Sequence, residues 1–173
     1  MARFIELRRH TDNEGDVLTD EGVREAVELG ALLIGVYSVV YSSGAQRATQ
    51  TAGCILAGLR DAVANGVRVE TRLRSAVEDR WRAAAKAAGS SDLNAIRFQD
   101  PALVEEDSAR LADGLRAIFG GLGHGEMALA VGHSPTNEAA VYGLTGQTIE
   151  PLAKGGGVMV VEDAGGFRVE ELR

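Results

Sequence analysis

Short apolar segments alternate with amphipathic helical segments along most of the chain, and this alternation limits the possible folds more than any other feature. Apolar runs and period-two patterns predict strands at residues 3–7, 39–41, 67–70, 127–131, 158–162 and 167–172. Helical spacing and capping signals predict helices at residues 19–34, 45–64, 75–88, 101–119 and 134–144, whereas residues 93–100 lack a clear pattern. Because the links are short, we expect an α/β fold with a mainly parallel sheet and a C-terminal hairpin.

Length and composition favour one ordinary globular domain that spans residues 1–173. Hydrophobic residues make up 45% of the 173 residues and charged residues 25%, which is enough for one buried core. No apolar run approaches the roughly 18–20 residues that cross a bilayer, and the first residues lack a signal-peptide pattern. We therefore expect a cytoplasmic protein.

Charge and cysteine content disfavour several classes of partner and cofactor. The formal net charge is −7, and both nucleic acids and anionic membranes require a basic face. Cys54 is the only cysteine, so the chain has no internal disulfide, and no Cys/His cluster has the spacing of a zinc site. We expect no metal, no other cofactor and no nucleic-acid or membrane partner, and the oligomeric state stays open.

Two of the three histidines directly follow predicted strands. Arg9 and His10 follow the first strand, His133 follows the strand at 127–131, and Arg47 comes after the Ser/Gly turn that ends the strand at 39–41. In parallel sheets, ligands bind beyond the carboxyl ends of the strands, so these side chains are expected to converge. A neutral imidazole can attack phosphorus, and arginine forks neutralise phosphoryl oxygens. The pattern predicts metal-independent phosphoryl transfer through a histidine.

Four spaced segments also carry a family resemblance. They are Leu7-Arg-Arg-His10-Thr, Leu18-Thr19, Ser43-Gly-Ala-Gln-Arg47-Ala-Thr-Gln50-Thr-Ala52 and Val131-Gly-His133-Ser-Pro. Together, in this order, they resemble the histidine phosphatase superfamily, the phosphoglycerate mutase-like group. The short chain and the segment Pro151-Leu-Ala-Lys154-Gly-Gly-Gly-Val158 are most similar to the small SixA-type phosphohistidine phosphatases. The resemblance implies a three-layer α/β/α sandwich.

The resemblance further implies a role for each matching residue. His10 would be the nucleophile, and Arg9 and Arg47 would hold the phosphoryl group. His133 would donate a hydrogen bond to the same group. No metal or other cofactor takes part in the chemistry that the resemblance implies.

Two positions next to the nucleophile depart from the family pattern. Thr11 stands where the family usually has glycine, which lets a backbone approach phosphate closely, so Thr11 is expected to shape the pocket floor or add a hydroxyl contact. Asn13 stands where many members carry a hydroxyl residue. Both residues are candidates for phosphate contact.

The proton donor for the leaving group is open between two alternatives. Expulsion of an alkoxide needs a general acid, which the family usually takes from the segment after the third strand. Ser75 stands close to that position, and Glu78 and Asp79 follow within one helical turn. Either Glu78, or else Asp79, serves as this catalytic acid, or no acid exists, as the SixA resemblance implies for a leaving group as good as imidazole.

Three functions remain in competition. The first is a phosphatase that forms phospho-His10 and hydrolyses it, with a phosphorylated small molecule or a phosphohistidine protein as substrate. The second is a phosphoglycerate mutase-type phosphotransferase, which the short chain disfavours. The third is a catalytically weak module that binds a phosphate ligand.

Other polar and aromatic residues are expected to play structural roles. Arg8 is expected to face solvent, opposite to Arg9 along the strand. Residues 105–107 (Glu-Glu-Asp) are expected to be a solvated first turn of a helix. Trp81 is expected to be a packed core residue, and His124 to lie in a surface loop.

Overall fold

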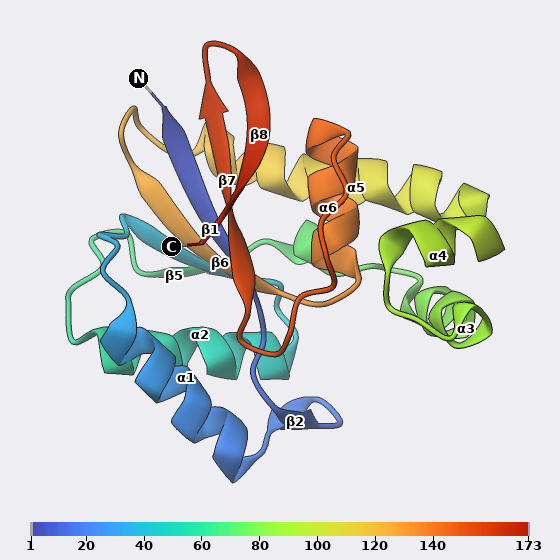
Figure 1. Cartoon of the computed structure of the whole chain (residues 1–173). Helices are drawn as coiled ribbons and strands as arrows, with labels where there is room; N and C mark the ends of the chain where they lie inside the picture. Colours follow the sequence, from blue (N-terminus) through green and yellow to red (C-terminus); the bar gives the residue numbers. More distant parts are fainter. Residues whose placement is uncertain (1, 173) are drawn as a thin grey trace.

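The computed structural model describes residues 2–172 and is built around a six-stranded sheet (Figure 1). In spatial order the strands are β5 (Val67–Val69), β4 (Val39–Ser42), β6 (Met127–Gly132), β1 (Arg3–Arg9), β7 (Gly157–Asp163) and β8 (Gly166–Glu171). The first four strands run parallel to one another, whereas β7 runs antiparallel to β1 and β8 antiparallel to β7. The predicted α/β fold with a mainly parallel sheet and a C-terminal hairpin is confirmed.

Helices cover both faces of the sheet. On one face lie α1 (Asp20–Leu32) and α2 (Gln46–Leu59), and on the other lie α5 (Pro101–Gly120) and α6 (Thr136–Thr145) (Figure 1). A short helix η1 (Thr71–Leu73) leads into α3 (Glu78–Ala88) and α4 (Leu93–Gln99) beside α5, and β2 (Asn13–Glu14) and β3 (Val17–Leu18) form a small hairpin. Within residues 2–172, none of these helices has the length and apolarity to span a membrane.

The alternation of side chains along the strands divides the apolar interior into two clusters. Val40 and Val131 point into the cluster shared with α1 and α2, whereas Val39, Tyr41 and Ala130 point into the larger cluster shared with α5 and α6. Burying a large aliphatic side chain contributes about 1.5–3 kcal/mol, so the two clusters hold both helical layers onto the sheet. This is the three-layer sandwich that the family resemblance implies.

Near the site, one helix is shorter than predicted and another forms where no helix is predicted. Helix α3 begins at Glu78 and not at Ser75, because the Ser75 hydroxyl donates to Asp107 Oδ2 at 2.6 Å and accepts from the backbone N–H of Val77. Residues 93–99, which lack a clear pattern, form α4, whose first turn is capped by the Asp92 side chain accepting from Ala95 N at 2.9 Å. A helix of this length has too few turns to show a clear period.

Two side chains that were expected to be solvated are buried. Arg8 is 9% exposed, because β1 continues through Arg9 and the loop before β7 covers it. Its Nε donates to Glu6 Oε1 at 2.5 Å and its Nη1 to the Gly155 carbonyl at 2.8 Å. Asp107 is 4% exposed, and its Oδ2 also accepts from Trp81 Nε1 at 2.7 Å. The expected packing of Trp81 in the core is confirmed.

Candidate active site

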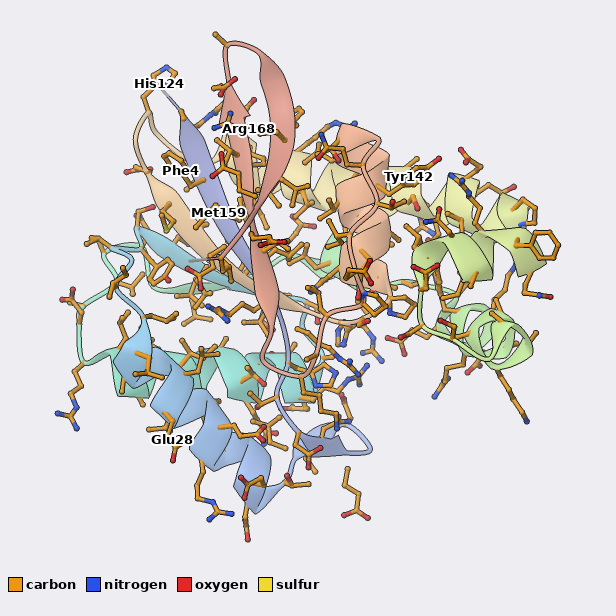
Figure 2. The ribbon with its side chains drawn as sticks, viewed as in Figure 1. Phe4, Glu28, His124, Tyr142, Met159 and Arg168 are labelled. Atoms are coloured by element: carbon orange, nitrogen blue, oxygen red, sulfur yellow. The ribbon has the colours of Figure 1, made fainter. Side chains whose placement is uncertain are left out.

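The carboxyl ends of β1 and β6 bring the two predicted histidines together. These strands are hydrogen-bonded neighbours with Arg9 opposite Gly132, so His10 and His133 both leave the sheet at the same edge. The backbone N–H of His10 donates to the Gly132 carbonyl at 3.1 Å. The centres of the two imidazole rings lie 5.4 Å apart, with their planes inclined by 60°. His124 lies before β6, at the opposite end of the sheet (Figure 2).

His10 is held in one tautomer by its neighbour along the chain. Its Nδ1 lies 2.8 Å from the Thr11 carbonyl oxygen, and because a carbonyl only accepts hydrogen bonds, Nδ1 carries the proton. The lone pair of Nε2 is then free. Burial lowers the pKa of His10 to about 4, helped by the charges of Arg47 and Arg9 and opposed by the bond to Thr11. At neutral pH the ring is therefore uncharged.

His133 is buried beside His10 with one nitrogen unpaired. Its Nε2 lies 2.8 Å from Ser43 Oγ at the end of β4, and its Nδ1 is buried with no hydrogen-bond partner among residues 2–172. Burial, followed by the charges of Arg47 and His10, lowers the pKa of His133 to about 3. A neutral ring has one N–H, so a hydroxyl that donates to Nε2 leaves Nδ1 as the donor.

Arg9 reaches the site from the last position of β1. Its Nη1 donates to the Leu152 carbonyl at 2.8 Å, and its Nε is buried with no partner among the described residues. Burial lowers the pKa of Arg9, and the negative charge of Glu138 acts in the opposite direction. The positive charge of Arg9 also lowers the pKa of His10. The hydrogen bond to the Leu152 carbonyl fixes one side of the Arg9 guanidinium.

Arg47 lies in the first turn of α2, where it is held between two carboxylates. Its Nη1 donates to Asp16 Oδ1 at 2.7 Å, and its Nη2 lies 3.6 Å from Glu78 Oε1. Glu78 also accepts from Arg74 Nε at 2.7 Å, and this bond is the main reason that the pKa of Glu78 is lowered. Glu78, the predicted acid, thus lies beside Arg47 as an ionised carboxylate.

A pocket of about 340 Å³ opens beside these groups. Arg47, Glu78, Arg82, His133 and Pro135 are among the residues that line it. The pocket has room for a group attached to a phosphoryl centre near the histidines. Among residues 2–172, no three His, Cys, Asp or Glu side chains are grouped so that they could hold a metal ion.

Thr11 and Asn13 are placed differently from the four residues above. The Thr11 hydroxyl donates to the Gly22 carbonyl at 2.7 Å, and its backbone N–H donates to Thr51 Oγ1 at 3.2 Å. Gly22 allows this contact, since a Cβ there would lie 2.0 Å from the Asp12 carbonyl oxygen. The Asn13 amide donates to Gly15 inside the turn between β2 and β3, and phosphate contact by Thr11 or Asn13 stays a prediction.

Two residues that the sequence did not single out support the site. Asn137 ties β1 to β6, because its Oδ1 accepts from His133 N at 3.2 Å while its Nδ2 donates to the Arg8 carbonyl at 3.0 Å. Lys154 forms an ion pair with Asp12 and lies near enough to His10 to lower the pKa of that ring. In the sequence, the only feature that points to Lys154 is its place in the glycine-rich segment before the hairpin.

Comparison with known proteins gives one family and several structural relatives. A family model described as "Histidine phosphatase superfamily (branch 1)" matches residues 5–157. A search of curated protein sequences gave no match. Phosphoglycerate mutase from Bacillus anthracis str. Sterne superposes with a TM-score of 0.68 at 20% identity, covering 99% of this chain and 92% of that one.

Two further solved structures carry different names. The alpha-ribazole phosphatase from Shigella flexneri has a TM-score of 0.66 at 17% identity, covering 99% of this chain and 96% of that one. A candidate phosphohistidine phosphatase SixA from Agrobacterium tumefaciens has a TM-score of 0.59 at 14% identity, with coverage of 97% and 95%. At such identities these likenesses show the fold and do not single out the SixA type. From the match over residues 5–157, the chain belongs to the histidine phosphatase superfamily, branch 1.

Proposed function

We propose that this chain is a phosphatase that transfers a phosphoryl group first to Nε2 of His10 and then to water. The hydrogen bond from His10 Nδ1 to the Thr11 carbonyl carries the proposal, because it leaves Nε2 with a free lone pair in an uncharged ring. The superfamily acts on phosphorylated substrates, which agrees with the two arginines beside that ring. A histidine that served only as a structural donor would not need this cationic surrounding.

In the first step, the Nε2 lone pair attacks phosphorus. The new P–N bond forms as the bond from phosphorus to the leaving group breaks, and the leaving group takes that electron pair. Arg9 and Arg47 offset the negative charge on the phosphoryl oxygens. His133 Nδ1–H donates to one of these oxygens, which agrees with Ser43 donating to Nε2 while accepting from Ala45 N at 3.4 Å.

In the second step, water attacks phosphorus and the P–N bond breaks. Its electron pair returns to His10 Nε2, the phosphoryl group leaves as inorganic phosphate, and the proton of the attacking water passes to a base. Because the bond to Thr11 holds the same tautomer before and after the cycle, the ring needs no proton transfer of its own.

Glu78 remains the candidate proton donor, but its surroundings favour particular substrates. The pair with Arg74 lowers the pKa of Glu78, so in the resting protein this carboxylate accepts protons more readily than it donates them. A leaving group that needs little protonation suits such a site best. We therefore favour a protein phosphohistidine or an activated phosphomonoester over an alkyl phosphate.

Hydrolysis of p-nitrophenyl phosphate in the presence of EDTA tests the proposal. The wild-type protein is expected to turn over and to be inhibited by vanadate, and His10→Ala is expected to abolish turnover. His124→Ala is the matched control, since it removes another of the three histidines at the opposite end of the sheet (Figure 2). Robust hydrolysis by His10→Ala would show that the nucleophile is another group.

Rapid quenching with ³²P-labelled substrate separates the three functions. A phosphatase gives a transient label on His10 that is lost in acid and stable in alkali, as the P–N bond requires. A mutase transfers the label to monophosphoglycerate faster than to water. A binding module shows tight binding of a phosphate ligand by calorimetry, with neither label nor turnover.

A further inference from the structure

One fully buried carboxyl beside the site has no part in the mechanism above. Glu138 in α6 is 0% exposed. Its Oε1 accepts from the Ser134 hydroxyl at 2.6 Å and from the backbone N–H of Leu152 at 2.8 Å. Its Oε2 is buried without a hydrogen-bond partner among the residues that the structure describes. Such a group is costly to bury, so its presence needs a reason.

The two bonds of Glu138 connect it to both halves of the site. Ser134 directly follows His133 in the chain. Leu152 donates its N–H to Glu138, and its carbonyl accepts from Arg9 Nη1 at 2.8 Å. The carboxyl of Glu138 therefore fixes the backbone unit that fixes one side of the Arg9 guanidinium.

Glu138 and Arg9 also have complementary unpaired atoms. Within residues 2–172, Arg9 Nε is a buried donor without an acceptor, and Glu138 Oε2 is a buried acceptor without a donor. Burial raises the pKa of Glu138 and lowers the pKa of Arg9, and the attraction between their opposite charges acts against both shifts.

We propose that Glu138 is a positioning residue for Arg9, which holds the guanidinium at the phosphoryl site through Leu152 and through its own buried charge. The inference rests on the proposed role of Arg9 as a phosphoryl ligand. Unlike Arg9, Glu138 would touch neither the substrate nor the reacting atoms.

Glu138→Gln tests the proposal, because the two possible roles of Glu138 predict opposite changes in phosphate affinity. The glutamine oxygen can still accept from Ser134 and Leu152, but an NH₂ group replaces Oε2 and the negative charge is lost. If Glu138 acted only as a charge, its removal would raise the positive potential at the site and tighten phosphate binding. If Glu138 positions Arg9, the loss loosens the guanidinium and weakens phosphate binding.

A double-mutant cycle measured as inorganic phosphate affinity tests the proposal. The proteins are wild type, Glu138→Gln, Arg9→Lys and the double variant, each checked for cooperative thermal unfolding. Glu138→Gln is expected to weaken phosphate binding about tenfold, the lower end of what an orienting partner contributes. In the Arg9→Lys background the same change is expected to cost less than about twofold, because the two effects are coupled.

A control in the same helix separates positioning from loss of stability. Val141 is fully buried in α6 and belongs to the apolar cluster, so Val141→Ala destabilises the helix packing without touching Arg9. It is expected to leave phosphate affinity unchanged. Should Glu138→Gln not fold, Glu138→Asp, which shortens the side chain, enters the same cycle with the same criteria.

Each outcome decides the matter. Tighter phosphate binding by Glu138→Gln, or an equal loss in both backgrounds, overturns the positioning role. A wild-type protein that binds phosphate without turnover refutes the phosphatase and leaves the cycle to decide on Glu138. A wild-type protein that does not bind phosphate at all refutes both.

Discussion

His10 is expected to stay unprotonated far below the pH at which a histidine usually gains its proton. Burial, reinforced by nearby arginines, lowers the pKa of His10 from 6.5 to about 4. At pH 5.5 a histidine with that pKa is neutral in about 97% of molecules, whereas an ordinary histidine is neutral in about 9%. The uncharged form of His10 should thus be about ten times more abundant at pH 5.5 than that of an ordinary histidine.

The titration can be followed directly. We expect the ¹³C-labelled ring of His10, assigned by its loss in His10→Gln, to keep its neutral-form shift from pH 8 to about 5. The kcat for p-nitrophenyl phosphate should stay level over the same range, with circular dichroism confirming the fold at each pH. A titration midpoint near 6.5 in the folded protein, or a fall in kcat of about fivefold between pH 6.5 and 5.5, would refute the reasoning.

The lowered pKa also has a consequence for stability. Between pH 6.5 and about 4 the unfolded chain binds a proton at His10 that the folded chain does not, so the free energy of unfolding falls as the pH falls through this window. A lowering of this size corresponds to about 3 kcal/mol once the pH lies below both values. In urea denaturation, His10→Gln should therefore lose less stability than the wild type between pH 7 and pH 4.5.

Three substitutions test the other groups of the site. Arg47→Lys, which replaces a fork by a point charge, should lower kcat/KM by about 10²–10³-fold, while Arg116→Lys on the exposed face of α5 should leave it unchanged. Glu78→Gln should slow hydrolysis of phosphoserine by about 100-fold but that of p-nitrophenyl phosphate far less if Glu78 is the proton donor, and equal effects exclude that role. Asp107→Ala should lower the free energy of unfolding by about 2–4 kcal/mol in urea, because it leaves two buried donors unpaired, and an unchanged midpoint would contradict that account.

The edge of the sheet that carries the candidate site could be located from the sequence because the relevant signals are local. His10 and His133 each directly follow an apolar strand, and the rule that parallel strands present their carboxyl ends together does not depend on long-range detail. The proximity of the two imidazoles was therefore predictable, and the ring distance of 5.4 Å agrees with it. The chemical roles of these side chains stay predictions until activity is measured.

The buried polar contacts could not be predicted, because each joins distant parts of the chain. The buried Arg8 donates a hydrogen bond to the carbonyl of a residue 147 positions later in the sequence. The buried Asp107 accepts one from the hydroxyl of a residue 32 positions earlier. Both residues have the local pattern of solvated positions, Arg8 near a strand end and Asp107 in the charged run Glu105-Glu-Asp107 of α5. Periodicity shows which face a residue occupies, but it does not show what covers that face.

The same limit explains why Arg9 and Arg47 could be predicted from the sequence, whereas Lys154 and the carboxylates Asp12 and Asp16 could not. Arg47 is fixed by Asp16 from the loop before β3, and Lys154 by Asp12 from the loop after β1. Cations gathered around a neutral histidine repel one another and need anions nearby to stay in place without a phosphate. An incoming phosphoryl group must then compete with Asp16 for Arg47, so its affinity depends on residues outside the family motif. Substrate preference within this fold is therefore expected to follow these partners more than the shared histidines and arginines.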